Sequence, residues 1–307
     1  MNRNLEDKNY NSQYYRAFLL VFLSGLLWSF GVVVVRYMID ANQYQPQYLF
    51  YRGIAISVIL CIYLFFREGF TFYKNFKKIG IPGIIGGLCL ASAFTGFIFS
   101  ITMTSAAVTL FMLAVMPFIA AIFGYLILKE TLRRMTLLSM IIAFIGVTIM
   151  IINDSINGSV IGAFVGFLSA LGFALYTVTI RWRPKTPKFT TVVLAGIFCT
   201  LFSLIIIFVY NKPFVIPVQN ICLSLLHGSL VATGLILYSL GAKYILAAEL
   251  ALLSLMEVIG GVLWVWIPLF GINEVPSFLT IIGGAVVILA VILHGFGAKI
   301  KLIPPTT

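Results

Sequence analysis

Residues 247–267 read AAELALLSLMEVIGGVLWVWI, an apolar run that is long enough to cross a bilayer as a helix. The run carries a carboxylate, Glu257, near its middle. A charged side chain at the centre of a membrane helix costs about 2.5–3.5 kcal/mol on insertion scales, so such a residue usually faces a cavity or a partner and not lipid. Gly260, Gly261 and Trp264 follow at helical spacing, so we expect them to share the face of Glu257.

The composition of the whole chain indicates a membrane protein. Hydrophobic residues make up 61% and charged residues 9% of the chain, with a mean hydropathy of +1.09, whereas soluble proteins average about 25% charged residues. The polar N-terminal tail does not resemble a secretory signal peptide, so we expect the first apolar segment to remain as a span. The four cysteines lie singly, without metal-ligand spacing, so we interpret them as packing residues and expect no metal or cofactor.

Ten apolar segments approach the length of about 20 residues that a membrane helix needs. They lie at 17–38, 48–66, 79–101, 104–128, 136–152, 160–180, 190–210, 220–241, 247–270 and 277–296. The connections between them are short. We therefore predict an all-α membrane protein with ten transmembrane helices.

The positions of Lys and Arg predict the orientation of these spans. With the N-terminus inside, 17 of the 20 Lys and Arg residues fall on the cytoplasmic side, and only Arg36, Arg52 and Lys212 fall outside. We therefore expect a plasma-membrane protein with both termini in the cytoplasm, and the short loops favour a bacterial inner membrane. The net charge of +11 lies in these loops, so it is interpreted as topology-setting charge and no nucleic-acid partner is expected.

An internal repeat relates the two halves of the chain. A shift of 141 residues places Met116 on Glu257 and Pro117 on Val258. Each half holds five predicted helices, and because five is odd the second copy enters the membrane from the opposite side. Two inverted copies with a site between them near the midplane are a recurring transporter design. The predicted parts are a cytoplasmic tail at 1–16, a first five-helix unit at 17–152, a second inverted unit at 160–296 and a cytoplasmic tail at 297–307.

Short motifs along the spans also resemble a known family. They are Gly25-Leu26-Leu27-Trp28-Ser29-Phe30, Ser105-Ala106-Ala107, Pro117, Lys129-Glu130-Thr131, Gly146-Val147, Leu255-Met256-Glu257-Val258, Trp264-Val265-Trp266, Glu274-Val275-Pro276-Ser277 and Gly283-Gly284. In their order and spacing, over about residues 17–296, they resemble the drug/metabolite transporter superfamily, EamA type. The resemblance implies a ten-helix secondary transporter with inverted repeats and a central cavity, and it leaves the substrate open. Three extra residues before Glu274 depart from the repeat and leave the geometry of that outer turn open.

The sequence shows no Walker A motif, paired-cysteine motif or nucleophile elbow, so we do not expect an enzyme or a self-contained ATP-driven pump. We predict a secondary active transporter that moves a small polar metabolite, such as an amino acid or another zwitterion, by alternating access in export or exchange. Two alternatives are an uptake carrier of the same fold for an organic cation or osmolyte and, from another class, a non-transporting membrane enzyme or assembly factor. The coupling ion, a proton or another ion, and the oligomeric state stay open.

Charged residues inside the spans are the first candidates for the substrate site. Glu257 is expected to bind a cationic group of the substrate or to exchange a proton; alternatively, it is a structural acid bonded to a neighbouring helix. Arg52 is expected to hold a substrate carboxylate, or else to reach the outer interface or pair with Asp40. His227 is a second candidate for proton coupling, with a neutral histidine bonded to the backbone as the alternative.

Aromatic side chains and one proline complete the predicted substrate site. The aromatic candidates, chosen from the family pattern, are Trp28, Phe94, Phe97, Tyr176, Tyr238 and Trp264. Pro117 removes a backbone hydrogen bond within the fourth span, which would expose carbonyls beside a cavity; packing is its alternative role. Glu249, near the inner end of the ninth span, is expected to pair with Lys243.

Overall fold

The computed structural model describes residues 2–103, 109, 112–151, 160–183, 185–272 and 277–297, and this part of the chain is helical with no strand. Six helices are long and apolar enough to cross a membrane. They are α1 (Asn2–Arg36), α2 (Gln45–Glu68), α4 (Gly80–Met103), α8 (Val160–Trp182), α9 (Lys188–Val209) and α10 (Val218–Gly241). Each contains most of one predicted span, and α1 also takes in most of the predicted tail at 1–16.

The remaining elements are shorter. The apolar ones are α6 (Met116–Phe123) with the π-helix η2 (Gly124–Leu128), α7 (Arg134–Ile151), α11 (Ala247–Ser254), α12 (Met256–Trp266) and α13 (Phe278–Gly297). The connecting ones are η1 (Gly69–Tyr73), α3 (Lys74–Lys78) and η3 (Pro268–Phe270). Part of the predicted span 104–128, Glu274 and the tail beyond Gly297 lie outside the described residues, so the total of ten spans stays a prediction.

The segment 247–270 is not the continuous helix that its apolar run predicts. The α-helix is interrupted at Leu255, where the N–H of Leu255 donates to Leu252 O at 3.2 Å and the N–H of Val258 donates to Leu255 O at 3.0 Å. Both hydrogen bonds span three residues, as in a 3₁₀-helix, instead of the four of an α-helix. The Ser254 hydroxyl also donates to Ala251 O at 2.7 Å and so competes with the backbone N–H groups for carbonyl acceptors. Hydropathy does not mark this interruption, because it reports burial and says little about local hydrogen bonding.

A similar interruption precedes α6. The N–H of Val115 donates to Met112 O at 3.2 Å, and the N–H of Phe118 donates to Val115 O at 3.1 Å. Pro117 therefore stands in the first turn of a restarted helix, where its missing N–H leaves no bond unmade. Under the shift of 141 residues, Ala114 falls on Leu255, so the two interruptions occupy equivalent places in the two halves.

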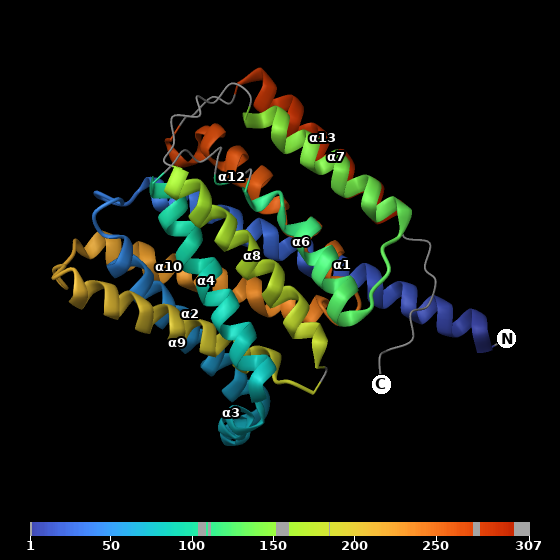
Figure 1. The fold of residues 1–307 in the computed structure, drawn as a ribbon, viewed down its shortest axis with the longest axis horizontal. Coiled ribbons are helices and arrows are strands. Elements are labelled where there is room, and N and C mark those ends of the chain that lie inside the picture. Colours follow the sequence, from blue (N-terminus) through green and yellow to red (C-terminus); the bar gives the residue numbers. More distant parts are fainter. Residues whose placement is uncertain are drawn as a thin grey trace.

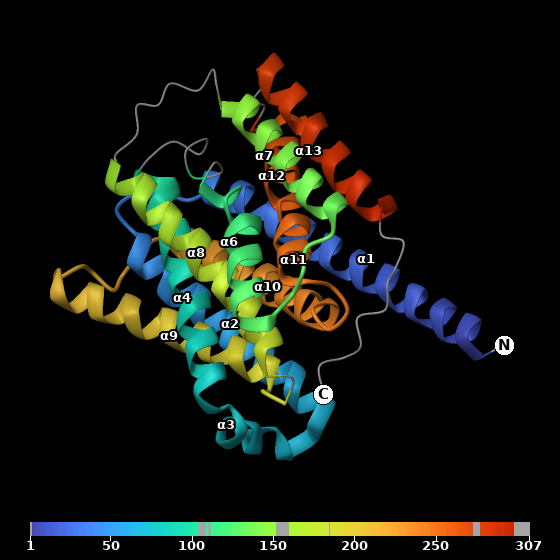
Figure 2. The same cartoon turned by 45° about the vertical axis from the view of Figure 1, so that its right-hand side comes forward.

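The two halves of the sequence interdigitate in space. Helix α4 packs on α8 and α9, α1 on α10 and α12, α2 on α9 and α10, α6 on α11, and α7 on α13. Figures 1 and 2 both show α7 and α13 as an adjacent pair at one side of the bundle, with α1 extending towards the N-terminus. Each of these pairs joins one helix before residue 152 to one after residue 159, so neither half forms its packing alone.

Small residues set the close approach of several pairs. A Cβ on Gly53 of α2 would lie 2.7 Å from the carbonyl oxygen of Gly196 of α9, and a Cβ on Gly146 of α7 would lie 2.8 Å from that of Gly283 of α13. Backbones approach this closely only where side chains are absent, which is a common device in membrane helices. Between 39 and 50% of the residues in the six hydrophobic windows are buried, so the other apolar residues are left to face lipid.

Candidate functional site

A cavity lies among the central helices, between the two interruptions. Its empty space, counting its opening to the outside, is about 540 Å³. Five of its side chains are polar or ionisable: Arg52, Ser169, His227, Ser254 and Glu257. The lining residues are Trp28, Arg52, Ala93, Phe94, Phe97, Leu113, Met116, Ser169, Phe173, His227, Val231, Leu235, Ser254 and Glu257.

Arg52 lies on the eighth position of α2 and is 4% exposed. Its guanidinium carbon is 5.1 Å from the centroid of the Phe94 ring, a cation–π arrangement that helps to hold a buried charge. Its Nε and Nη1 atoms are buried without a hydrogen-bond partner, and no ion pair found in the described chain involves it. Arg52 therefore does not pair with Asp40, and it offers two N–H donors to a ligand.

Glu257 lies in the first turn of α12, partly buried at the cavity wall. Arg52 acts electrostatically on its carboxyl group, yet the two are not joined as an ion pair. Among the described residues, no hydrogen bond uses the Glu257 carboxylate, so its alternative role as an acid bonded to a neighbouring helix is not seen. The same cavity is thus lined by one basic side chain, Arg52, and one acidic side chain, Glu257.

His227 of α10 is 2% exposed and hydrogen-bonds through Nδ1 to the hydroxyl group of Tyr48 on α2. Its partner is therefore a side chain and not the backbone group that the alternative reading expected. The bond fixes the ring, and the histidine still lines the cavity. His227 and Arg52 stand on adjacent packed helices, α10 and α2.

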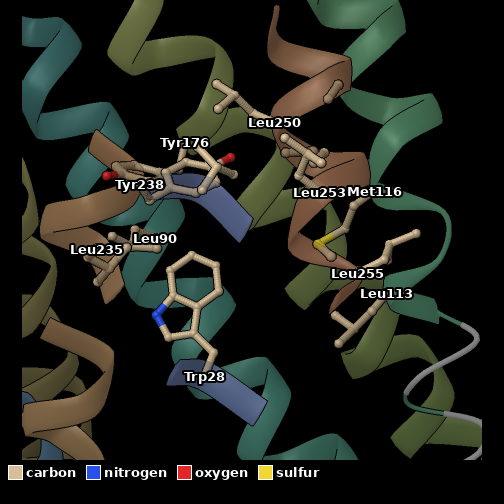
Figure 3. Packing of buried hydrophobic residues seen from close by; sticks show 14 of the residues in the cluster. Trp28, Leu90, Leu113, Met116, Tyr176, Leu235, Tyr238, Leu250, Leu253 and Leu255 are labelled. Atoms are coloured by element: carbon tan, nitrogen blue, oxygen red, sulfur yellow. The ribbon is translucent and has the colours of Figure 1, made fainter. Parts of the chain in front are cut away.

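Aromatic rings form one wall of the cavity. The Trp28 ring lies 5.5 Å from the rings of both Phe173 and Tyr238, and its Nε1 donates to Val231 O at 3.3 Å. Figure 3 shows Trp28 below Tyr176 and Tyr238, with Met116 and Leu113 close to Leu253 and Leu255 at the right of the view. Trp28 thus presents an apolar face while its polar group is already satisfied.

Four predicted site residues do not line the cavity. Tyr176 and Tyr238 stack behind Trp28 with centroids 6.4 Å apart, and their hydroxyl groups bond to Ser239 at 3.3 Å and Thr177 at 2.7 Å. Trp264 stacks on Phe30 and donates to Ser29 Oγ at 2.7 Å.

Pro117 is the fourth of these residues, buried beside the lining residue Met116. The glycine face that follows Glu257 explains the position of Trp264: Gly260 and Gly261 pack on α1, against Ser29 and Val32. The part of α12 that follows Glu257 therefore packs on α1, while Glu257 itself lines the cavity.

The repeat could have found several lining residues that the family pattern missed. Under the shift of 141 residues, four pairs of positions line the cavity from both halves. These pairs are Trp28 and Ser169, Phe94 and Leu235, Leu113 and Ser254, and Met116 and Glu257. Ser169 and Ser254 donate to Ala93 O and Ala251 O, which leaves hydroxyl lone pairs as acceptors. Phe173 carried no comparable signal, because its equivalent, Val32, does not line the cavity.

An ion pair joins the ends of several helices at one side of the bundle. Arg181, at the end of α8, pairs with Glu130 at 2.6 Å, and its Nη1 donates to Ala242 O at 2.5 Å and also to Ile245 O. The other Glu130 oxygen accepts the N–H of Ala247 at 3.0 Å, which places a negative charge at the N-terminus of α11. The prediction for Glu249 was wrong: it does not pair with Lys243, because it points between α1, α7 and α13.

Comparisons with known proteins found several similar chains. Residues 15–152 match the model of the EamA-like transporter family. Two curated relatives, each described as an uncharacterized transporter, come from Helicobacter pylori strains ATCC 700392 / 26695 and J99 / ATCC 700824; they are 30% and 28% identical over 156 residues. Each match covers 50% of this chain and 51% of the relative, so the chain spans about half the length of these relatives in the match.

A solved structure, described only as a crystal structure of a protein, superposes with a TM-score of 0.73. It covers 92% of this chain and 97% of the other at 16% identity, which supports the fold alone. The family match confirms the resemblance to the EamA type that the sequence motifs carry.

Proposed function

We propose that this chain, whose residues 15–152 match the model of the EamA-like transporter family, is a secondary active transporter for a small zwitterionic metabolite such as an amino acid. The carrier lies in the plasma membrane, in a bacterium the inner membrane, with both termini in the cytoplasm. It works by export or exchange. The substrate binds in the cavity that Arg52 and Glu257 line.

One observation carries the proposal: a basic and an acidic side chain line the same cavity without forming an ion pair with each other. The buried Nε and Nη1 of Arg52 have no partner, and Glu257 makes no hydrogen bond among the described residues. A buried charge without a partner is costly, so a ligand that supplies one recovers that free energy. A carboxylate fits the planar donors of Arg52, and an ammonium group fits Glu257.

The remaining lining residues suit the middle of such a ligand. Trp28, Phe94, Phe97 and Phe173 supply apolar surface, and Ser169 and Ser254 supply hydroxyl acceptors. Small-molecule sites have this composition, mostly apolar with a few placed polar groups. The proposed substrate is therefore a zwitterion with an apolar or aromatic body.

The proposed mechanism is alternating access between two inverted repeats. The helix packing is the same when the two halves are exchanged. The contact of α4 with α8 corresponds to that of α10 with α1, and the contact of α4 with α9 corresponds to that of α10 with α2. The equivalent lining pairs and the two equivalent interruptions support a site on the axis between the halves. Rocking of one half against the other would then expose the same cavity to each side.

A thermal-shift panel on the purified protein tests the substrate class. The panel holds an amino acid, its amide, which lacks the carboxylate, and its N-acetyl form, which lacks the ammonium group. The zwitterion is expected to stabilise the protein, by about 2.7 kcal/mol at a concentration of 100 times Kd, and the two derivatives are expected to act at least tenfold more weakly. Several amino acids with apolar and aromatic side chains fill the panel.

Variants of Arg52 complete this test. Arg52→Gln should abolish the response, and Arg52→Lys should weaken it, because lysine keeps the charge but loses the planar pair of donors. Arg36→Gln, at the exposed end of α1, is the matched control and should respond as the wild type does. An equal response to the amide and the zwitterion, or an unchanged response of Arg52→Gln, would contradict the proposal. Counterflow in vesicles of known orientation then gives the direction of transport.

A further inference from the structure

A second group of buried ionisable side chains lies outside the cavity, where α1, α7, α11 and α13 meet. Glu249 of α11 is 1% exposed and His294 of α13 is 2% exposed, with Nε2 and Oε2 3.9 Å apart. The Tyr14 hydroxyl of α1 lies 3.4 Å from Glu249 Oε2 and 3.5 Å from His294 Nε2. Thr136 of α7 donates to the other Glu249 oxygen at 3.1 Å.

The charges around this pair are few. Arg133, just before α7, acts electrostatically on His294, and its buried Nη1 has no hydrogen-bond partner. On the other side of the first turn of α11 lies the Glu130–Arg181 ion pair, whose charges are already matched. Lys243, in the turn before α11, is exposed with its amine 5.3 Å from the Tyr244 ring centroid. Arg133 therefore acts on the pair from outside it.

A carboxylate and an imidazole at this distance form one titrating unit. With a proton on the imidazole the two groups are an ion pair; without it, Glu249 is a buried anion held by Tyr14 and Thr136. The imidazole also changes its role towards the Tyr14 hydroxyl, because a protonated ring can only donate. A single proton thus rearranges the contacts that join four helices.

The first turn of α11 connects this pair to the cavity. Glu249 is the third residue of α11, and the same helix ends at the lining residue Ser254. Glu257 follows eight residues after Glu249, or about 12 Å along a helix. The interruption at Leu255 lies between them, at a place where the chain can bend. Contacts at one end of α11 are therefore able to move residues at its other end.

We propose that Glu249 and His294 form a proton-binding site, separate from the cavity, whose occupancy sets how firmly the first turn of α11 is held. The site binds its proton in the absence of substrate. It goes beyond the proposed function, and it stands whether or not the cavity binds a zwitterion.

The chain offers a direct test because it contains only two histidines, His227 and His294. Protein labelled with ¹⁵N-histidine and purified with a histidine-free tag gives two imidazole signals, which His227→Gln assigns by removing one. The His294 signal is expected to titrate between pH 5 and pH 9 in the absence of substrate. Glu249→Gln should displace the midpoint to lower pH, because it removes the neighbouring negative charge that stabilises the protonated imidazole.

Hydrogen exchange over residues 247–255 reports the coupling. After correction for the intrinsic rate, exchange in wild type should change at least threefold across the His294 midpoint, and it should not change in His294→Gln. His227→Gln is the matched control and should keep the change. Where Glu249→Gln does not fold, Tyr14→Phe removes the hydroxyl bridge to both groups and should also displace the midpoint.

A His294 signal that is constant from pH 5 to pH 9 would overturn the proposal. A hydrogen-exchange rate in α11 that does not change as His294 titrates would also overturn it. Both measurements use substrate-free protein. A failed amino-acid panel with a titrating His294 would overturn the proposed function alone, and the reverse result would overturn the proton site alone.

Discussion

At the scale of single residues, the two charges that line the cavity decide what the cavity can bind. Arg52 presents N–H groups without partners, and Glu257 presents a carboxylate that no hydrogen bond among the described residues uses. His227 differs, because its Nδ1 is already bonded to Tyr48. Glu257 is therefore the residue whose chemical change should alter transport most directly.

Replacement of Glu257 by glutamine keeps its shape and removes its charge. Glu257→Gln is expected to lower transport at least tenfold, about 1.4 kcal/mol, and to flatten the dependence of transport on pH if the carboxylate also carries the proton. The measurement is uptake or counterflow into vesicles between pH 5.5 and 8. Glu68→Gln, an exposed acid at the end of α2, is the control and should transport as the wild type does. Unchanged transport with an unchanged pH profile would remove Glu257 from the mechanism.

At the scale of helices, close packing and local interruption have different causes. Glycines bring α2 to α9 and α7 to α13 until backbone atoms touch, which fixes the positions of these helices. The interruptions at Ala114 and Leu255 instead break the regular α-helical hydrogen bonding beside the cavity. Helices that are rigid in pairs and interrupted near the site are suited to movement as units.

The pair of α7 and α13 allows a matched test of packing. Gly146→Ala places a Cβ 2.8 Å from the Gly283 carbonyl oxygen, whereas a Cβ on Gly284 has no atom within 4 Å. Gly146→Ala is expected to destabilise the protein by about 1–3 kcal/mol through overpacking, and Gly284→Ala should leave stability unchanged or raise it slightly. Thermal unfolding followed by tryptophan fluorescence measures both. Equal melting temperatures for the two variants would show that the helices separate easily.

At the scale of the whole molecule, the Glu130–Arg181 ion pair joins the end of α6 and η2 to the ends of α8, α10 and α11. Both side chains are largely shielded, with exposed fractions of 17% and 12%. A pair that joins both halves of the chain at one end of the bundle is suited to hold that end closed. Positive-inside counting predicts that this end is cytoplasmic.

Loss of this pair should open the cytoplasmic end. In a chain with its four cysteines replaced, Ser254→Cys reports access to the cavity, and Arg181→Gln is expected to speed its labelling from the cytoplasmic side about tenfold. Arg183→Gln, two residues later and exposed, is the control and should leave the rate unchanged. Slower labelling, or equal rates in the two variants, would show that the pair is not a gate.

The sequence by itself determined the class of the protein and the location of its long helices. Hydropathy marks α1, α2, α4, α8, α9 and α10 because a helix that faces lipid must be apolar over its whole length. It also marked Arg52, Glu257 and His227, since charged or titratable groups inside apolar runs stand out in composition. The family motifs added Trp28, Phe94 and Phe97, all of which line the cavity.

Only the tertiary structure decided which face of each helix meets the cavity. Trp264 lies seven residues after Glu257, about 10 Å further along the helix, and packs on α1 there, whereas Tyr238 lies behind Trp28. The partner of Glu249 was set in the same way: Lys243 is near in sequence, whereas His294 and Tyr14 arrive from the two ends of the chain. Contacts between distant segments depend on how the helices pack, which hydropathy and spacing along the chain do not encode.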